Sequence, residues 1–392
     1  MNELDSILST LDAEPEAARD AVLTTVVHVK GSAYRRPGAR MLILPDGRRL
    51  GSISGGCLEG DACRKAWWFT EGGKPSVRIY DTSSDSDAVW EFGLGCNGMV
   101  HVLFERVNDS GVTESLRFLA DARAERRGVV VATVIAETGG AKIATGARLL
   151  VDRTGVQGGA LAGTSIEAAV VEHARECLLR QKSFLAHLSS GEGMHADVFV
   201  EWIGPPQELV IFGAGHDAQP VVRYAKEFGW HVTVADGRAN YATRARFPEA
   251  DHVVVLHREH PLQGIRISRD TAVVMMTHNY PQDSILLGHI LPAKPRYLGM
   301  LGPGSRTVSL LEEVGLPTAG IDIHAPVGLD LGSDAPASIA LAIVAEIQAV
   351  LHGRQGGLLK HRRGAIHDAA IESGEANEIL NQNLETPVCE LT

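Results

Sequence analysis

The chain has 392 residues, of which 44% are hydrophobic and 22% charged. This is the composition of an ordinary globular protein, and it excludes an intrinsically disordered chain, which lacks the apolar side chains for a core. At about 150 residues per domain, the length predicts two or three domains. The net charge of -11 argues against a nucleic-acid partner, because proteins that bind nucleic acids carry a basic surface.

Neither a secretory signal nor a membrane span is expected. The first 20 residues are acidic and contain no apolar region, and no stretch approaches the roughly 18 apolar residues that a bilayer requires. The five cysteines are odd in number and sparse, so they do not form a disulfide framework. We therefore expect a cytoplasmic protein with reduced thiols and no membrane partner.

An internal repeat divides the N-terminal half. Residues 21–63 align with residues 129–171 at an offset of 108 without gaps, and 13 of the 43 pairs are identical. Random pairing at average residue frequencies would give about three identities. The identical pairs include Gly38-Ala39-Arg40 with Gly146-Ala147-Arg148. We interpret the two segments as copies of one unit.

Each copy is predicted to form a strand, a turn, a second strand, a turn, a helix and a closing strand. In copy one, the first strands and the helix are expected at residues 21–29, 40–44 and 58–69. The closing strands are expected at 100–106 and 197–202, where Gly98-Met99 aligns with Gly193-Met194 at an offset of 95. Copy two is then shorter by 108 minus 95, or 13 residues, between its helix and its closing strand.

The differences between the copies separate candidate functional residues from structural ones. Residues that both copies share are expected to form the fold. Several hydroxyl, guanidinium and thiol groups occur only in copy one, which also carries a long insert at residues 81–96. These candidates for function are Ser32, Tyr34, Arg35, Arg36, Ser52, Ser54, Cys57 and Cys96.

The stretch Ser52-Ile53-Ser54-Gly55-Gly56-Cys57 immediately precedes the predicted helix. The N–H groups of a glycine turn and a helix N-terminus together attract anions, which makes the serines, glycines and nearby arginines candidate ligands of an anionic cofactor. The same positive potential favours a thiolate, so Cys57 and Cys96 are candidates for a reactive sulfur. The alternative for each cysteine is a small thiol that fills space beside a glycine turn.

The C-terminal half begins after Pro205-Pro206 and has the pattern of a dinucleotide-binding fold. A strand at 208–212 runs into G-x-G-x-x-A at 213–218 and an amphipathic helix, and the next strand ends in Asp236, 23 residues after Gly213. This order and spacing indicate a Rossmann βαβ unit. Further strands of a parallel sheet are expected at 231–235, 251–256, 272–276 and 296–298. A last helix is expected at 336–350.

In a sheet of this kind the ligand binds beyond the carboxyl ends of the strands. Asp236 is expected to bond a ribose hydroxyl, although it could also serve only as a turn residue in Asp-Gly-Arg. No zinc site is expected, because the histidines around residue 257 do not share a face. The residues expected around this crevice are Gly213, Gly215, His216, Asp236, His257, Thr277, His278 and the loop at 299–306.

Six short motifs are distributed over both halves of the chain, at residues 31–41, 51–60, 93–98, 276–278, 297–299 and 323–332. Together they resemble the XdhC/CoxI-type accessory factors of molybdenum hydroxylases, over about residues 15 to 355. The chain departs from the family pattern at Asn97 and in the loop at 302–306, where the family has Cys-Gly-Gly and Gly-Ser-Arg-Arg. The second departure removes one arginine near the expected phosphate loop, which includes Ser305 and Arg306.

The repeat, the βαβ pattern and the resemblance predict a two-domain α/β protein. An N-terminal α+β domain at 1–204 contains the repeats 21–106 and 129–202, and a Rossmann-like, doubly wound parallel sheet covers 205–355. A tail at 356–392 is expected to be extended or partly helical.

The resemblance implies a protein that binds the molybdenum cofactor, as molybdopterin or its cytosine dinucleotide. Such a protein protects the cofactor while its terminal oxo ligand is exchanged for sulfide, and delivers it to a xanthine or aldehyde dehydrogenase-type apoenzyme. The implied partners are that molybdenum hydroxylase apoenzyme, a cysteine desulfurase and a second copy of the chain in a homodimer. This makes the protein a cofactor-binding maturation factor rather than a catalyst, in which Cys57 or Cys96 would carry the inserted sulfur or ligate the molybdenum.

Two other functions fit parts of the sequence. The glycine turn and Asp236 alone would favour an NAD(P)-dependent oxidoreductase, with His278 as the acid or base. A protein–protein adaptor that binds no ligand would also keep the fold, because fold does not decide function.

Overall fold

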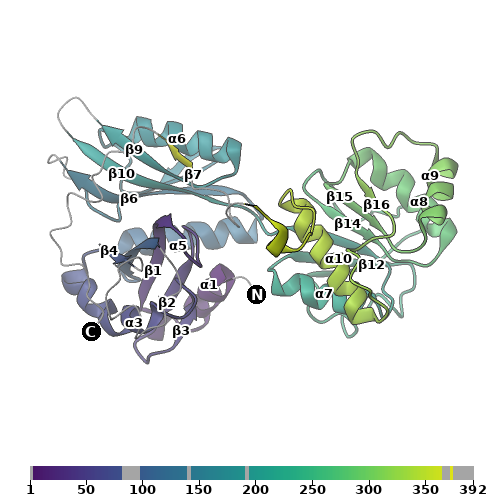
Figure 1. Cartoon of the computed structure of the whole chain (residues 1–392), viewed down its shortest axis with the longest axis horizontal. Helices are drawn as coiled ribbons and strands as arrows, with labels where there is room; N and C mark the ends of the chain where they lie inside the picture. The colour runs from purple at the N-terminus through teal and green to yellow at the C-terminus, as the bar shows by residue number, and fades with distance from the viewer. Residues whose placement is uncertain (1–2, 82–97, 139–142, 190–193, 364–370, 374–392) are drawn as a thin grey trace. The chain divides into compact units, whose positions relative to one another are not determined.

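The computed structural model describes residues 3–81, 98–138, 143–189, 194–363 and 371–373 (Figure 1). The chain divides into two compact units, and the division between them falls at Pro205-Pro206. Within the described ranges, no helix combines the length and the apolar character needed to cross a bilayer. Each unit is built around its own sheets and hydrophobic clusters, which place the candidate ligand-binding residues at strand ends.

The N-terminal unit contains two mainly antiparallel sheets, one from each copy of the repeat (Figure 1). The first has the order β3-β2-β1-β5-β4, and helix α3 packs on one of its faces. Its elements are β1 (Val22–Gly31), β2 (Arg40–Ile43), β3 (Arg49–Gly51), α3 (Glu59–Phe69), η1 (Glu71–Gly73), β4 (Ser76–Asp81) and β5 (Gly98–Arg106).

The second sheet repeats this arrangement and adds a strand from the C-terminal tail. Its order is β17-β9-β10-β6-β7-β8, with β17 parallel to β9 at the edge. Its elements are β6 (Val129–Thr138), β7 (Arg148–Asp152), β8 (Gly155–Gly158), α6 (Glu167–Arg180), β9 (Phe184–Ser189), β10 (His195–Ile203) and β17 (Ile371–Ser373). Helices α1 (Glu3–Ala13), α2 (Pro15–Ala18) and α5 (Ser110–Ala124) complete the unit.

The strand registers correct the predicted alignment of the closing strands. Val22 lies opposite Arg106 in copy one, and Val130 lies opposite Trp202 in copy two. Since 130 minus 22 is 108 and 202 minus 106 is 96, the closing strands correspond at an offset of 96, and the predicted 95 was wrong. Copy two is thus 12 residues shorter, and the match of two Gly-Met pairs was coincidental.

A one-residue slip matters because it would turn every side chain of the strand to the opposite face. At the observed offset Glu105 of β5 corresponds to Glu201 of β10, and both face the space between the sheets. The opening strands also carry a β-bulge at equivalent residues, Val27 and Ile135. The duplication therefore extends to irregular details of the backbone.

Two reciprocal ion pairs join the copies. Arg40 of β2 donates from Nη1 to Glu201 Oε1 at 2.8 Å and from Nη2 to Oε2 at 2.5 Å. Arg148 of β7 donates from Nη2 to Glu105 Oε2. All four residues are buried, with exposed fractions of 9% or less. The Gly-Ala-Arg sequence shared by the copies thus links each sheet to the other copy.

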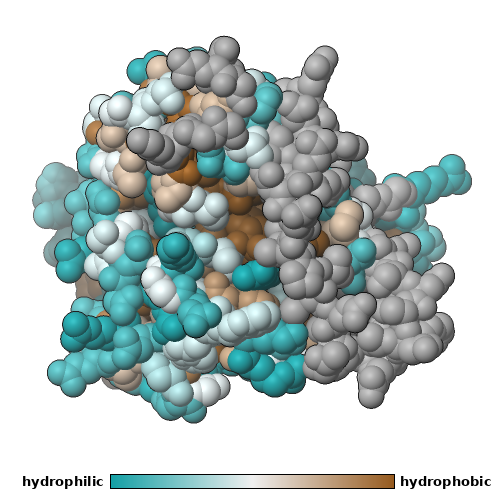
Figure 2. All heavy atoms as spheres, turned by 90° about the vertical axis from the view of Figure 1, so that its left-hand side faces the viewer, coloured by the Kyte–Doolittle hydropathy of each residue, from teal (hydrophilic) through white to brown (hydrophobic). Residues whose placement is uncertain are grey.

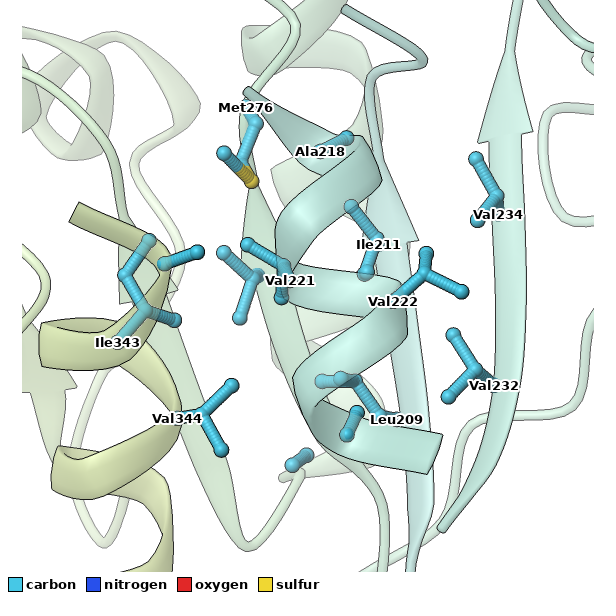
Figure 3. Close-up of a cluster of buried hydrophobic side chains, with 14 of the residues drawn as sticks. Leu209, Ile211, Ala218, Val221, Val222, Val232, Val234, Met276, Ile343 and Val344 are labelled. Atoms are coloured by element: carbon cyan, nitrogen blue, oxygen red, sulfur yellow. The ribbon is translucent and has the colours of Figure 1, made fainter. Parts of the chain in front are cut away.

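The C-terminal unit is the predicted parallel α/β sheet, in the order β13-β12-β11-β14-β15-β16. In Figure 3, Ile211 of β11, Val221 of α7 and Ile343 of α10 contribute to one apolar layer between the sheet and two neighbouring helices. Leucines of α8 and α9 cover the other face of the sheet. The elements are β11 (Glu208–Phe212), α7 (Ala218–Glu227), β12 (His231–Asp236), β13 (His252–Val255), β14 (Ala272–Met275), α8 (Tyr280–Ile290), η2 (Leu291–Ala293), β15 (Tyr297–Met300), α9 (Gly304–Val314), β16 (Ile323–His324), α10 (Pro336–Leu351) and η3 (Leu359–His361).

We predict that the reciprocal ion pairs make the N-terminal unit sensitive to loss of one charge. Glu201→Gln leaves the Arg40 guanidinium buried without its counter-charge, and removal of one partner of a buried pair typically destabilises by about 3–5 kcal/mol. Glu105→Gln should act in the same way on Arg148. Urea unfolding of both variants measures the change in free energy.

The exposed pair Arg48–Glu14 provides the control, and Glu14→Gln should leave the unfolding curve unchanged because exposed pairs contribute little. The double variant Arg40→Met with Glu201→Leu should be less destabilised than Glu201→Gln, since no charge remains buried. An unaltered unfolding free energy in Glu201→Gln would contradict the structural role given to the pair.

Candidate functional site

The loop before α3 is organised by Glu59, the first residue of that helix. Glu59 accepts hydrogen bonds from Ser52 Oγ at 2.7 Å, from the Ser54 amide at 2.8 Å and from Ser54 Oγ. Ser54 Oγ in turn accepts the Gly56 and Leu58 amides, each at 3.1 Å. The two serines predicted to bind a cofactor therefore hold the glycine turn in shape.

These contacts also determine the ionisation of Glu59. Burial acts to raise the pKa of this carboxyl, but hydrogen bonds from Ser54 and Ser52 outweigh it and hold the pKa below the ordinary value of 4.5. In copy two the equivalent Glu167 accepts the amide of Gly163 at 2.7 Å. A carboxylate at the start of the helix is thus common to both copies, and the hydroxyls are specific to copy one.

Two of the N-terminal motifs meet at this turn. A Cβ placed on Gly55 would lie 3.4 Å from Cγ of Tyr34, so the tyrosine ring rests on the glycine. That ring is 70% exposed. A Cβ on Gly98, the last residue of the third motif, would come within 2.6 Å of the Ser32 carbonyl oxygen, which explains why only glycine fits there. The chain around Ser32 therefore contacts residues of both neighbouring motifs.

The remaining N-terminal candidates differ in their surroundings. Cys57 is partly buried, and its Sγ lies 3.4 Å from Ser54 Oγ. Arg35 forms an ion pair with Glu3 of α1, and no ion pair involving Arg36 occurs among the described residues. Cys96 lies outside the described residues. Of Arg35 and Arg36, therefore, only Arg36 has a charge that is unpaired within the described residues and can attract an anionic ligand.

One face of the N-terminal unit, on the left in Figure 1, is drawn in Figure 2. Apolar residues gather near its middle among hydrophilic ones. An apolar area of this kind does not identify a ligand, because much of any protein surface is apolar.

A cleft of about 570 Å³ lies at the carboxyl ends of three strands in the C-terminal unit. This volume falls in the range of about 300–1,000 Å³ that is typical of small-molecule sites. The sequence predicted three of its residues, His257, Thr277 and His278. The others are Gly237, Arg238, Leu256, Arg258, Pro261, Asn279, Pro281, Gln282, Ile285 and Leu286.

Asp236, the predicted ribose ligand, has hydrogen-bond partners within the protein on both oxygens. Its Oδ2 accepts the Ala214 amide at 2.7 Å and Arg238 Nη2 at 2.7 Å, while Oδ1 accepts the Arg238 amide and Nε. Burial acts to raise the pKa of Asp236, but these donors lower it below the ordinary value. With 2% of its surface exposed, Asp236 connects the glycine turn to Arg238.

The glycine turn itself faces protein atoms. A Cβ on Gly213 would lie 2.3 Å from the Met276 carbonyl oxygen, so this glycine allows the turn to pack against the end of β14. A Cβ on Gly215 would lie 2.4 Å from Asp217 Oδ1. Asp217 Oδ2 lies 3.0 Å from Nε2 of His278, which adopts a positive φ of 55°. Such strained backbone is common at ligand-binding sites.

The predicted phosphate loop is tied to the cleft through one buried carboxylate. Asp283 accepts Thr277 Oγ1 on one oxygen and Arg306 Nη2 on the other, the latter at 2.7 Å. Burial raises the pKa of Asp283 above its ordinary value despite both donors. Arg306 is therefore engaged inside the protein. Ser305 and His216 are exposed.

Two further motifs meet around Glu346 of α10. Its carboxylate accepts the Tyr297 hydroxyl and, at 2.9 Å, the Gly328 amide, and lies 3.3 Å from His324 Nδ1. The Tyr297 and His324 rings stack with their centroids 4.4 Å apart. The hydrogen bond to Glu346 raises the pKa of His324. These motif residues fix the loop after β16 to α10.

The sequence interpretation missed Arg238 and Arg258, although both follow strands whose carboxyl ends were expected to form the crevice. It also missed Asp217, Asp283 and Glu59, which act by holding other side chains. Within the described residues, no group of three or more His, Cys, Asp and Glu side chains is placed to hold a metal ion.

We predict a pH-dependent contribution of Glu59 to stability. Glu59→Gln removes the charged acceptor of three hydrogen bonds and should destabilise the protein by roughly 1–3 kcal/mol at about pH 7. Because the folded pKa lies below 4.5, this contribution is present above that pH and is lost as the pH falls through the folded pKa. Urea unfolding of both proteins between about pH 7 and about pH 3 measures it.

Glu167→Gln is the matched control, since its carboxylate accepts the Gly163 amide without the two serine hydroxyls. The control should show a smaller loss of stability. If Glu59→Gln destabilised the protein equally at all pH values, the ionised Glu59 carboxylate would not be the group that organises the loop before α3.

Comparison with known proteins agrees with these features in both units. Residues 209–347 match the XdhC Rossmann domain, and residues 16–81 and 122–189 match the XdhC and CoxI family. A relative in Bacillus subtilis (strain 168), named as a probable subunit of xanthine dehydrogenase, is 33% identical over 86% of this chain and 95% of its own. "Molybdenum cofactor insertion chaperone PaoD" of Escherichia coli (strain K12) is 25% identical over 88% and 87%.

The fold is also found in a solved structure. A crystal structure of a xanthine dehydrogenase from Bacillus halodurans superposes with a TM-score of 0.73 and 31% identity, covering 91% of this chain and 97% of the other. The resemblance inferred from the six motifs is confirmed. The chain belongs to the XdhC and CoxI family.

Proposed function

We propose that the protein binds the molybdenum cofactor as cargo, holds it while its terminal oxo ligand is exchanged for sulfide, and delivers it to a molybdenum hydroxylase apoenzyme. The observation that carries the proposal is the cleft beyond the parallel sheet, because it combines cationic and apolar residues in a volume suited to a pterin. Two relatives support it, one named as part of xanthine dehydrogenase and the other as a cofactor insertion chaperone.

The residues of the cleft fit such a cargo. Arg238, Arg258, His257 and His278 supply positive charge or hydrogen-bond donors for a phosphate. Gln282 and Asn279 offer amide groups that can pair with the edge of a heterocycle. The bound cargo would supply the molybdenum and its dithiolene, whereas the chain binds, orients and shields it.

The copy-one turn is proposed to take part in sulfuration. Cys57 is the partly buried thiol beside Ser54, and Arg36 carries charge without an ion-pair partner in the described ranges. A cysteine desulfurase is the proposed source of sulfur. Cys96 is the second candidate for a reactive thiol. A homodimer in the cytoplasm is the proposed form of the protein.

Native mass spectrometry of the protein purified from a molybdenum-replete host tests cargo binding directly. We expect a bound pterin species, and its loss in Arg258→Gln. A protein that carries no pterin and takes up none when the cofactor is added would refute the proposal.

We predict that Cys57→Ser keeps the fold, because Ser165 occupies the matching position in copy two. It should still bind cargo but deliver a cofactor that leaves the hydroxylase inactive. Client activity and thermal unfolding of the two proteins measure this.

Cys63→Ser, in the middle of α3, is the control and should activate the client fully. Burial raises the pKa of the Cys63 thiol, which disfavours a reactive thiolate. Full activation of the client by Cys57→Ser would exclude Cys57 as the sulfur carrier and leave Cys96 or the desulfurase itself in that role.

A further inference from the structure

The charge of the cleft is unlike that of the whole protein. The chain carries a net charge of -11, yet none of the described residues that line the cleft is Asp or Glu. Arg258 and His257 are exposed, and no ion pair within the described ranges involves either of them. Two cationic or titratable side chains without counter-charges therefore face a ligand, which favours an anion.

The other part of the lining is apolar. Leu256, Pro261, Pro281, Ile285 and Leu286 contribute hydrocarbon surface beside the basic residues. Ile285 is 44% exposed, so its side chain is accessible to a ligand in the cleft. A flat ring that carries an anionic group matches this combination of surfaces.

The usual diol contact is blocked. In Rossmann proteins an acid at the end of the second strand bonds a ribose hydroxyl of NAD, whereas an arginine nearby accommodates the 2′-phosphate of NADP. Here both oxygens of Asp236 already accept hydrogen bonds from Ala214 and Arg238. The Arg238 guanidinium lies 4.0 Å from the centroid of the Tyr241 ring, so it is fixed at the edge of the cleft. The acid is therefore unavailable to a ribose diol, and the charge of Arg238 is already paired with it.

The pyrophosphate position is also unfavourable. In a dinucleotide complex the pyrophosphate lies over the glycine turn at the start of the following helix. Asp217 immediately precedes α7, and its carboxylate lies against Gly215 and bonds His278. A negative charge at this point repels a pyrophosphate. The ligand's phosphate is therefore expected beside Arg258 and His257, away from the glycine turn.

We infer that this cleft binds a phosphate monoester attached to a flat heterocycle and discriminates against dinucleotides. The inference rests on the proposed function in assigning the heterocycle to a pterin, and it selects molybdopterin, with its terminal phosphate, over the cytosine dinucleotide. It also separates this chain from NAD(P)-dependent enzymes that share the fold.

Isothermal titration calorimetry with soluble probes tests the inference without the cofactor. At about pH 7.5 adenosine monophosphate is a dianion, because the second phosphate pKa is near 6, whereas cyclic adenosine monophosphate is a monoanionic diester. We expect the monoester to bind at least about tenfold tighter than the diester, adenosine or NADH. Arg258→Gln should weaken monoester binding by about tenfold and leave adenosine unchanged.

Two variants make the test specific. Arg269→Gln, an exposed arginine outside the cleft, should leave all four affinities unchanged. Asp217→Asn keeps a side-chain oxygen but removes the charge from the turn, so it should increase the affinity for NADH several-fold and reduce the preference for the monophosphate over NADH.

NADH binding as tight as the monophosphate in the unmodified protein would overturn the inference, as would equal effects of Arg258→Gln and Arg269→Gln. Failure of every probe to bind at millimolar concentration would overturn it as well. The proposed function is tested separately by the pterin content of the purified protein. A dinucleotide form found there would refute the monoester inference while supporting cargo binding.

Discussion

The N-terminal unit depends on two buried arginine–carboxylate pairs that cross between its sheets. Arg40 of copy one requires Glu201 of copy two, and Arg148 of copy two requires Glu105 of copy one. A buried guanidinium without its carboxylate would be strongly unfavourable, so neither copy can bury its own arginine alone. The positive φ of Gly38 and Gly146 brings each turn against the same carboxylates, at 2.8 and 2.9 Å from a hypothetical Cβ. The duplicated unit is therefore stable as a pair.

The residues common to the two copies are those that maintain the fold, and the other end of copy one carries additional groups. The shared Gly-Ala-Arg segment and the helix-initiating glutamates, Glu59 and Glu167, maintain both copies. The serines around Glu59 and the adjacent Cys57 occur in copy one alone. Since Ala162 and Ser165 stand at the positions of Ser54 and Cys57 in a copy that folds in the same way, the fold does not demand the hydroxyl or the thiol there. The two serine hydroxyls and the Cys57 thiol are therefore found together only in the turn before α3 of copy one.

Local sequence patterns predicted the elements that are determined by interactions between residues close together in the sequence. The parallel sheet, the glycine turn and the start of α10 at Pro336 followed from periodicity and turn residues. The offset of the closing strands did not, because the two Gly-Met pairs match one residue out of register, and only the hydrogen-bonded pairing of the strands reveals the true offset. Interactions between distant residues, such as Arg40 with Glu201, were likewise outside the reach of sequence patterns.

Site residues show the same limit. Thr277 and His278 were found because the carboxyl ends of parallel strands meet at one edge. The roles of Asp236 and Arg306 were not predictable, because each depends on whether a partner inside the protein already holds its charge. Asp236 bonds Arg238 two residues away, and Arg306 bonds Asp283 on another helix. A charged side chain near a glycine turn is available to a ligand only when no such partner exists.

In each unit, a carboxylate of the protein accepts a hydrogen bond from a backbone amide of the glycine turn. Glu59 accepts the amide and hydroxyl of Ser54, and Asp236 accepts the amide of Ala214. An anion that approached either turn would have to displace these internal acceptors, and the hydrogen bonds lost would offset part of the binding free energy. Arg258 and Arg36 carry no such internal partner among the described residues, so contacts with them add to affinity without a compensating loss. The delivery of cargo that we propose would require affinity of this limited kind, because every additional 1.4 kcal/mol of binding free energy would strengthen retention of the cargo about tenfold.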